Sequence, residues 1–416
     1  MSNLSYLEKL LDGVNVEWKS FGEIAKIQRG ASPRPIAKFI TDDEDGVPWI
    51  KIGDTESGSK YVEQTAQKIT KEGATKSRVL KKGDFIISNS MSFGRPYILN
   101  ITGAIHDGWA SISEFSDKLN SDFLYHYLSS QSVQNYWISK INSGSVSNLN
   151  ADIIKTLPVP IPCPDNPEKS LAIQAEIVRI LDAFTAMTAE LTAELNLRKK
   201  QYNYYRDKLL SFEEGDVEWR ALSEMAEYSK ARISYTELDD SNYVGVESLL
   251  QNRAGKIDST RTPDSGNLTQ YNPDDILIGN IRPYLKKIWH ADRVGGTNGD
   301  VLVVHPTDTA INPRYLYQVL ADDKFFEYNM QHAKGAKMPR GNKPKIMEYL
   351  VPIPFASDRE KSLSEQKRIV TILDKFDTLT SSITEGLPRE IELRQKQYEY
   401  YRDLLLSFPK SNEGAA

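Results

Sequence analysis

The chain has 416 residues, of which 39% are hydrophobic and 26% are charged, and its formal net charge at pH 7 is −5. This length exceeds the size at which one hydrophobic core keeps growing, so two or more domains are expected. The acidic balance argues against a nonspecific polyanion binder, and no run approaches the roughly 18 apolar residues that a membrane span requires.

The first twelve residues predict a short helical segment. Tyr6-Leu-Glu-Lys-Leu-Leu11 is similar to Tyr205-Arg-Asp-Lys-Leu-Leu210, and a Val-Glu-Trp sequence follows each of them. No basic start leads into an apolar stretch, so an export signal is not expected. The lone cysteine, Cys163, cannot form an internal disulfide, and a cytoplasmic location is therefore the expectation.

Residues 13–162 and 213–354 predict two globular α+β domains. Both contain short runs typical of strands, with Gly, Pro, Asn and Asp between them, and short amphipathic stretches typical of helices. Each domain ends in a similar proline-rich strand, Val-Pro-Ile-Pro, at 159–162 and at 351–354.

A heptad-like stripe of apolar residues follows each proline-rich strand. Between 163 and 212 the stripe predicts one helix of about 40 residues, roughly 60 Å long. Between 355 and 408 it predicts a second long helix with four additional residues, and Gly386 and Pro388 inside the insertion predict a kink. Because each stripe needs burial, we expect the two helices to form an antiparallel coiled coil, followed by a tail at 409–416.

The two halves of the chain are copies of one unit. Gln201-Tyr-Asn-Tyr-Tyr-Arg-Asp-Lys-Leu-Leu-Ser-Phe212 returns as Gln397-Tyr-Glu-Tyr-Tyr-Arg-Asp-Leu-Leu-Leu-Ser-Phe408, and Ile180-Leu-Asp182 returns as Ile372-Leu-Asp374. The expected fold is therefore a pseudo-twofold internal repeat of two globular domains separated by two long helices. The helical segment at 1–12 completes a circular, head-to-tail arrangement. Two copies of one unit suit a ligand that has two parts.

No catalytic motif stands out. The piece nearest to an amino-methyltransferase turn, Asn272-Pro-Asp-Asp275, lacks both the second proline and the aromatic residue. Glu17-Trp-Lys19 has the spacing of many nuclease sites but lacks an acidic partner, and its counterpart in the second copy reads Glu218-Trp-Arg220. We expect a hairpin rather than a phosphate cradle at Gly295-Gly-Thr-Asn-Gly299. With five scattered histidines and one cysteine, no metal site is expected.

The ordered duplication resembles the specificity subunits of type I restriction-modification systems. The resemblance covers almost the whole chain. It rests on two variable domains, each of which ends in the proline-rich strand. A long helix follows each strand and begins with the motif Gln-x-x-Ile-Val-x-Ile-Leu-Asp-x-Phe, at 174–184 and 366–376. Both copies then end in Tyr-x-Tyr-Tyr-Arg-Asp.

This resemblance implies a function and a set of partners. Each globular domain would be a target recognition domain that reads one half of a split double-stranded DNA site, with the helices as a spacer. Two modification subunits, which carry the S-adenosylmethionine site, would dock on the helical region, and restriction subunits would be further candidate partners. The chain itself would have no catalytic activity and no cofactor. Two alternatives stay open, namely a fused DNA methyltransferase or nuclease with an unrecognised site, and a coiled-coil assembly adaptor.

Three kinds of loop are candidates for DNA contact, because cations and hydroxyls bind phosphates while Arg, Lys, Asn and Gln read base edges. The strongest is the stretch at 334–345, with five cations and no acid, and its polar equivalent at 143–148. The second is Arg282-Pro-Tyr284 with the two lysines that follow, for which Arg95-Pro-Tyr97 is the expected counterpart, and the third begins at Gln28. For each loop, an ordinary solvated or scaffold role is the alternative. The candidate DNA-binding residues are Lys334, Lys337, Arg340, Asn342, Lys343, Lys345, Arg282, Tyr284, Lys286, Lys287, Arg95, Tyr97, Ser143, Ser145, Ser147, Asn148, Gln28, Arg29 and Arg34.

The repeated tyrosines are candidates for partner binding. They occupy more than one face of their helices, so some should pack within the chain while others could meet the modification subunits, since exposed aromatic residues are typical interface anchors. Packing within the chain alone is the alternative. These residues are Tyr202, Tyr204, Tyr205, Tyr398, Tyr400 and Tyr401.

Overall fold

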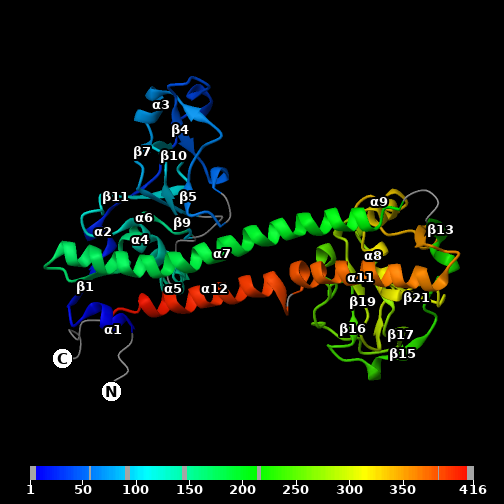
Figure 1. Ribbon diagram of the computed structural model, residues 1–416. Helices are drawn as coiled ribbons and strands as arrows, with labels where there is room; N and C mark the ends of the chain where they lie inside the picture. The colour runs from blue at the N-terminus through cyan, green and yellow to red at the C-terminus, as the bar shows by residue number, and fades with distance from the viewer. Residues whose placement is uncertain are drawn as a thin grey trace, which may run out of the picture. The chain divides into compact units, whose positions relative to one another are not determined.

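The computed structural model of the chain describes residues 6–55, 58–89, 94–142, 148–212, 217–382 and 384–409. The chain divides into two compact units, one made of Met1–Met187 with Arg394–Ala416 and the other of Thr188–Leu393 (Figure 1). Both units combine helices and sheets, so the expected α+β class is confirmed. Within the described residues, no helix is long and apolar enough to cross a membrane.

The first unit contains two five-stranded sheets and a two-stranded ribbon. The ribbon pairs β1 (Val16–Ser20) antiparallel with β12 (Pro158–Pro162). One sheet has the order β2 (Lys26–Arg29), β11 (Trp109–Ser113), β8 (Phe85–Ser88), β9 (Pro96–Leu99) and β5 (Tyr61–Val62). The other has the order β3 (Ile40–Thr41), β6 (Lys68–Ile69), β4 (Val47–Ile50), β10 (Gly103–Ile105) and β7 (Arg78–Leu80). The short helices are α1 (Tyr6–Leu11), α2 (Phe21–Ile24), α3 (Lys71–Thr75), α4 (Ser121–Leu128), α5 (Gln131–Asn142) and α6 (Ala151–Lys155).

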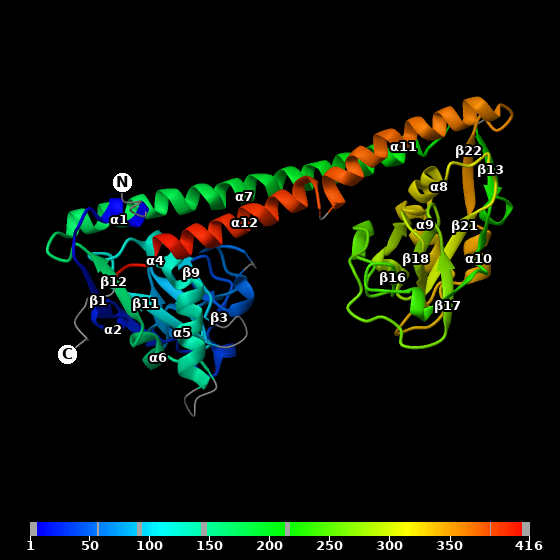
Figure 2. The same ribbon diagram turned by 90° about the horizontal axis from the view of Figure 1, so that it is seen from below.

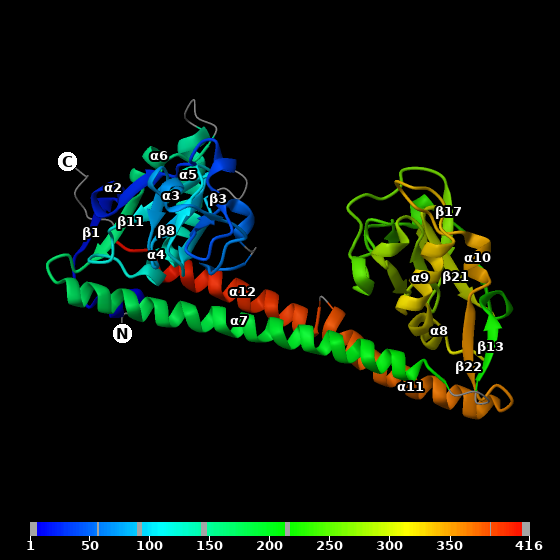
Figure 3. The ribbon, with the colours of Figure 1, turned by 90° about the horizontal axis from the view of Figure 1, so that it is seen from above.

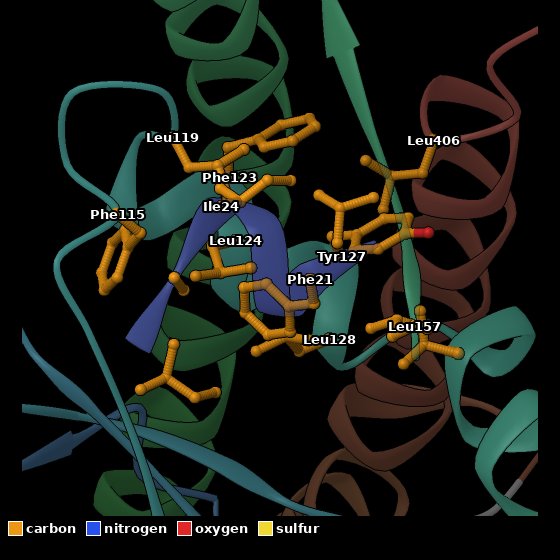
Figure 4. Packing of buried hydrophobic residues seen from close by; sticks show 14 of the residues in the cluster. Phe21, Ile24, Phe115, Leu119, Phe123, Leu124, Tyr127, Leu128, Leu157 and Leu406 are labelled. Carbon is orange, nitrogen blue, oxygen red and sulfur yellow. The ribbon is translucent and has the colours of Figure 1, made fainter. Parts of the chain in front are cut away.

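The core of the first unit forms around α4. The side chain of Asn120 caps this helix by accepting hydrogen bonds from the backbone N–H groups of Asp122 and Phe123. One face of α4 carries Phe123, Leu124, Tyr127 and Leu128, and Figure 4 shows these side chains among those of α2 and the C-terminal segment. Because burying each large apolar side chain contributes about 1.5–3 kcal/mol, this cluster accounts for the docking of α4.

The second unit repeats this scaffold with shorter sheets. Its ribbon pairs β13 (Val217–Ala221) with β22 (Leu350–Pro354), which lie side by side in Figure 2. One four-stranded sheet has the order β14 (Ala226–Tyr228), β21 (Val301–Pro306), β18 (Ile276–Gly279) and β19 (Ile288–His290). The other has the order β15 (Arg232–Ser234), β17 (Asn267–Tyr271), β20 (Gly295–Thr297) and β16 (Tyr243–Val244). Its short helices are α8 (Pro313–Leu320), α9 (Asp323–Gln331) and α10 (Lys343–Met347).

The glycine-rich stretch that begins at Gly295 is a buried strand, so the expected hairpin is wrong. Strand β20 pairs with β17 on one side and with β16 on the other. A Cβ atom at Gly295 would lie 2.1 Å from the backbone oxygen of Asn242, so only glycine permits this close approach.

The first long helix is confirmed, whereas the second is wrong as a single helix. Helix α7 runs unbroken over 43 residues, Pro167–Leu209. The second apolar stripe is divided between α11 (Arg359–Ser381) and α12 (Gly386–Leu405). The predicted kink is a break, because Gly386 has a φ of +77° and a Cβ there would lie 2.4 Å from the oxygen of Thr378.

In each unit a part of α7 runs antiparallel to a neighbouring helix. In the first unit this neighbour is α12 (Figure 3), and the rings of Phe184 and Tyr401 stack with centroids 5.1 Å apart. In the second unit it is α11, where Phe376 stacks on Tyr202 and Tyr205 at 5.8 and 5.4 Å. The repeated Phe and Tyr positions therefore pair the helices by aromatic contact.

The repeated glutamine of each long helix holds the globular part in place. Gln174 accepts a hydrogen bond from the Asn120 backbone N–H at 2.8 Å, and Gln366 accepts one from the Asn312 backbone N–H at 2.8 Å. Both side chains are fully buried. The Gln of the repeated motif thus fixes the start of α4 and of α8, and its repetition has a structural cause.

Candidate nucleic-acid and partner interfaces

The basic stretch that connects α9 to α10 forms a closed loop. Lys334 and Arg340 exchange two backbone hydrogen bonds of 2.9 and 2.8 Å, and Gly335, with a φ of +96°, allows the chain to turn between them. Lys337 and Met338 lie at the exposed tip. Neither Lys334 nor Lys337 has an acidic partner within 4 Å among the described residues. Their charges are therefore available to an anionic ligand.

This loop lies against the second predicted stretch. The backbone N–H of Arg282 donates to the oxygen of Pro339 at 2.7 Å, and that of Gly341 donates to the oxygen of Asn280 at 3.0 Å. Arg282 is exposed, and Tyr284 is 50% exposed. Two stretches that are more than 50 residues apart in the sequence thus lie in contact. We call their exposed residues Arg282, Tyr284, Lys334 and Lys337 the basic surface.

Several other predicted contacts in this region are occupied by internal partners. Arg340 pairs with Asp300 at 2.7 Å, and Lys345 pairs with Glu348 at 2.6 Å. Asn342 precedes the first turn of α10, where Lys343 is exposed. Arg340 and Lys345 therefore help to hold the loop and α10 in shape rather than present free charges.

The two lysines at 286 and 287 also turn inward. Lys286 pairs with Asp323 at 2.8 Å, and Lys287 donates to the backbone oxygen of Val246 at 2.6 Å. Burial lowers the pKa of Lys287 from its ordinary value. Both lysines therefore have internal partners, while Arg282 and Tyr284 of the same loop are exposed.

In the first unit, two of the predicted residues gather around Asp107. Arg34 lies 3.6 Å from the Asp107 carboxylate, and Nε of Arg29 donates to its backbone oxygen at 3.3 Å. Burial opposes ionisation of Asp107, but the hydrogen bond from Ser32 and the charges of His106 and Arg29 outweigh it and lower the pKa of this carboxyl. Both arginines are exposed, whereas Gln28 is half-buried in β2.

The expected match between Arg95-Pro-Tyr97 and Arg282-Pro-Tyr284 is wrong. Strand β9 pairs Tyr97 with Ile86 of β8, and the equivalent pair in the second unit joins Trp289 of β19 to Leu277 of β18. Tyr97 is 2% exposed and Arg95 is half-buried above its ring, with 5.5 Å to the ring centroid. Tyr97 therefore belongs to the core of the first unit, and the two tripeptides lie at different positions of the fold.

The polar stretch of the first unit is described only at its end. Ser143, Ser145 and Ser147 lie outside the described residues, and Asn148 is exposed. The stretch connects α5 to α6, as the basic loop connects α9 to α10. Its place in the fold therefore matches that of the basic loop.

The first tyrosine of each repeated motif is buried. Tyr202 is 5% and Tyr398 8% exposed, and burial raises the pKa of each to about 12. The Tyr398 hydroxyl lies 2.9 Å from Nδ1 of His126, whose Nε2 lies 2.8 Å from Asp182. Tyr202 contacts Gln318 and Arg206 in the equivalent place. These two tyrosines pack within the chain, so they are not available to a partner.

The second and third tyrosines of the motif face outward. Tyr204 and Tyr400 are 61% and 65% exposed, and each lies edge-on to the next tyrosine, with centroids 5.4 and 5.3 Å apart. Tyr205 and Tyr401 are both 40% exposed and stack on a phenylalanine on their other side. Each unit thus presents the same supported pair of aromatic rings.

The carboxylates that hold these loops could not be found from the sequence. Asp107 and Asp300 lie in equivalent turns, one between β10 and β11 and the other between β20 and β21, and each pairs with an arginine of a candidate loop. The two turns differ in sequence, so no repeated motif marked them. Within the described residues, no group of three or more His, Cys, Asp or Glu side chains could hold a metal ion.

Known sequences match the chain over nearly its full length. The specificity subunit of the type I restriction enzyme EcoR124I/EcoR124II of Escherichia coli is 36% identical, with 99% of this chain and 98% of that protein covered. The specificity subunit of the EcoprrI enzyme, also of Escherichia coli, is 32% identical over 92% and 93% of the two chains.

Solved structures share the fold. One comes from work on the structural basis of complex assembly and conformational transition of the type I R-M system. It has a TM-score of 0.61 at 14% identity, and the match covers 94% of this chain and 97% of that one. The type I restriction-modification S subunit from M. genitalium has a TM-score of 0.52 at 15% identity, covering 96% and 98%.

A family model matches both halves of the chain. Its description is type I restriction modification DNA specificity domain, and it matches residues 14–198 and 214–393. The two matched regions each contain one of the duplicated α+β domains. The chain therefore belongs to the DNA specificity family of type I restriction-modification systems.

Proposed function

We propose that the chain is a noncatalytic DNA-recognition subunit, in which each globular domain reads one part of a split double-stranded site. The observation that carries this proposal is the repetition of one scaffold whose two copies expose different cations, at different loops. The second unit presents Arg282, Lys334 and Lys337, and the first presents Arg29 and Arg34. Two similar scaffolds with different contact residues suit two different DNA sequences.

The basic surface of the second unit is proposed to lie against the duplex. Lysine and arginine without acidic partners bind phosphates, and arginine also reads guanine in the major groove. In the part of the chain that the structure describes, Arg282 and the two lysines form no ion pair, although the whole chain is acidic. Met338 and Tyr284, each 50% exposed, add apolar area to the same two loops.

The long helices are proposed to set the gap between the two DNA parts and to receive the modification subunits. The antiparallel contacts of α7 with α12 and with α11 support a paired spacer of the coiled-coil type. Tyr204, Tyr205, Tyr400 and Tyr401 would be partner contacts, because exposed aromatic rings that are held from one side make good anchors. The partners would supply S-adenosylmethionine and the chemistry, and the assembly would act in the cytoplasm.

Reversing the charge of both Lys334 and Lys337 to glutamate is expected to weaken DNA binding by the complete assembly about 10- to 100-fold and to lower the salt slope by about two. The physical reason is the loss of two phosphate contacts and the addition of two repulsive charges. Fluorescence anisotropy with a labelled duplex at several salt concentrations measures both quantities.

The matched control is Arg261→Glu, which reverses an exposed arginine of the same unit outside the basic surface. It should leave the affinity within about twofold. Wild-type affinity for the double variant would remove this loop from the DNA interface. Methyl transfer by the purified chain alone would favour the rival view of a fused methyltransferase.

A further inference from the structure

One carboxylate ties together two loops of the second unit. Asp323, the first residue of α9, accepts hydrogen bonds from Lys286 at 2.8 Å and from Arg253 at 2.7 Å, both at Oδ1. The backbone N–H of Arg253 also donates to the oxygen of Lys286 at 2.9 Å. The loop that presents Arg282 and Tyr284 is therefore fixed at its far end by Asp323 and Arg253.

Both loops hold backbone conformations that need such support. Arg253 and its neighbour Asn252 have φ values of 64° and 55°, while Arg282 and Lys286 have φ values of 52° and 51°. Residues other than glycine adopt this left-handed region at a cost and persist there only when their surroundings hold them. The ties made by Asp323 provide part of that support.

The clamp also reaches the end of α8. The Ala321 oxygen accepts a hydrogen bond from Arg253 at 2.9 Å and another from Arg206 at 2.6 Å. Arg206 belongs to the repeated Tyr-x-Tyr-Tyr-Arg motif of α7. Arg253 is thus fixed on two sides, which makes it a rigid anchor for Asp323.

The described residues of the first unit hold their short helices through other side chains. Nε2 of Gln134 on α5 donates to the oxygen of Gly94 at 3.1 Å and to that of Leu128 at 2.8 Å, so it joins the chain before β9 to the end of α4. Lys60, which precedes β5, pairs with Asp122 of α4 at 2.6 Å and with Asp182 of α7 at 3.5 Å. Both units therefore use polar side chains to tie a connection of the sheet to the short helices.

We propose that Asp323 is a positioning residue for DNA recognition by the second unit, holding Arg282 and Tyr284 in place through Lys286 and Arg253. This inference rests on the proposed function. Asp323 is an acidic residue near a surface that binds a polyanion, so electrostatics alone would make it unfavourable. Its benefit comes from fixing the loop before DNA binds. The apparent affinity for DNA falls in proportion to the fraction of molecules whose loop is in the binding conformation.

The two explanations predict opposite signs for Asp323→Asn, which removes the charge and keeps the shape. If Asp323 positions the loop, the complete assembly should bind its cognate duplex at least about tenfold more weakly. Discrimination should fall mainly in one of the two parts of the site, and Asp323→Glu should restore part of the affinity. If Asp323 is only a nearby negative charge, Asp323→Asn should bind DNA as tightly as wild type or more tightly, and that result would overturn the proposal.

The matched control is Glu227→Gln, which breaks the surface pair between Glu227 and Lys230 at 2.6 Å in the same unit. It should bind DNA like wild type or slightly tighter. Equal weakening by this control and by Asp323→Asn would also overturn the proposal, since any lost carboxylate would then act alike.

Amide hydrogen exchange of the full chain separates this inference from the proposed function. In Asp323→Asn, the segments at 251–255 and 282–287 should exchange faster together, with the rest of the unit unchanged. Unchanged exchange there would refute the clamp even if the assembly recognises DNA as proposed. Faster exchange in a chain whose wild-type assembly shows no site-specific binding would keep the clamp and reject the proposed function.

Discussion

Replacing Tyr204 and Tyr400 together by alanine is expected to weaken binding of each modification subunit by at least about 30-fold. Each ring is mostly exposed and is supported edge-on by the next tyrosine, so it costs little entropy to order on binding. Truncating two anchors of this kind typically costs about 2 kcal/mol or more each. Sedimentation or size-exclusion analysis of mixtures of the chain with its modification subunits measures the loss.

The single variants sharpen this experiment. If each unit binds one modification subunit, Tyr204→Ala or Tyr400→Ala alone should remove one subunit and leave the other bound. Tyr235→Ala, at an aromatic residue 37% exposed on the globular part of the second unit, is the matched control and should assemble normally. Full assembly of the double variant would show that these tyrosines serve packing within the chain alone.

Shortening the helical spacer is expected to change the DNA target without changing its specific parts. Removing seven residues, close to two turns, from α7 and seven from α12 shortens each helix by about 10 Å and keeps the apolar faces in phase. Since duplex DNA rises 3.4 Å per base pair, the gap between the two parts should shrink by about three base pairs.

Methylation mapping in cells that carry the complete system provides the readout for this variant. The shortened chain should give a motif with both specific parts intact and a shorter gap. A deletion from α7 alone leaves the helices out of step, so it serves as a control that should lose activity. If the shortened chain kept the parental gap, the helices would not set the spacing.

The repeat made much of the scaffold predictable. Gln174 and Gln366 recur because each accepts a hydrogen bond at the start of a short helix. The sequence motif that they share therefore reflects a shared structure. The unbroken length of α7 followed from its apolar period in the same way. For the second long helix, Gly386 and Pro388 marked the place of the interruption but predicted a kink rather than a break. The period of three and four residues continues across Gly386, although the backbone there turns to a φ of +77°. Periodicity shows which residues need burial, but it does not show whether one helix or two will bury them.

The candidate site was less accessible to sequence reasoning. The basic loop at 334–345 could be found from its charges, and its contact with Arg282 could not, because that contact depends on backbone hydrogen bonds between distant segments. Arg95-Pro-Tyr97 misled for the opposite reason, since a shared tripeptide falls at different points of the strand register. The role of Asp323 could not be found from the sequence, because its ion pairs with Arg253 and Lys286 require the start of α9 and two distant loops to meet.

The central claim is that each globular domain reads its own part of the DNA site and that the partners do the chemistry. Methylation mapping with a chain whose residues 217–354 are replaced by a copy of residues 16–162 tests this claim most directly, because both segments begin and end in equivalent paired strands. We expect the methylated motif to become two inverted copies of one part, separated by a gap. A motif unchanged from that of the natural chain, or one without a gap, would contradict the account.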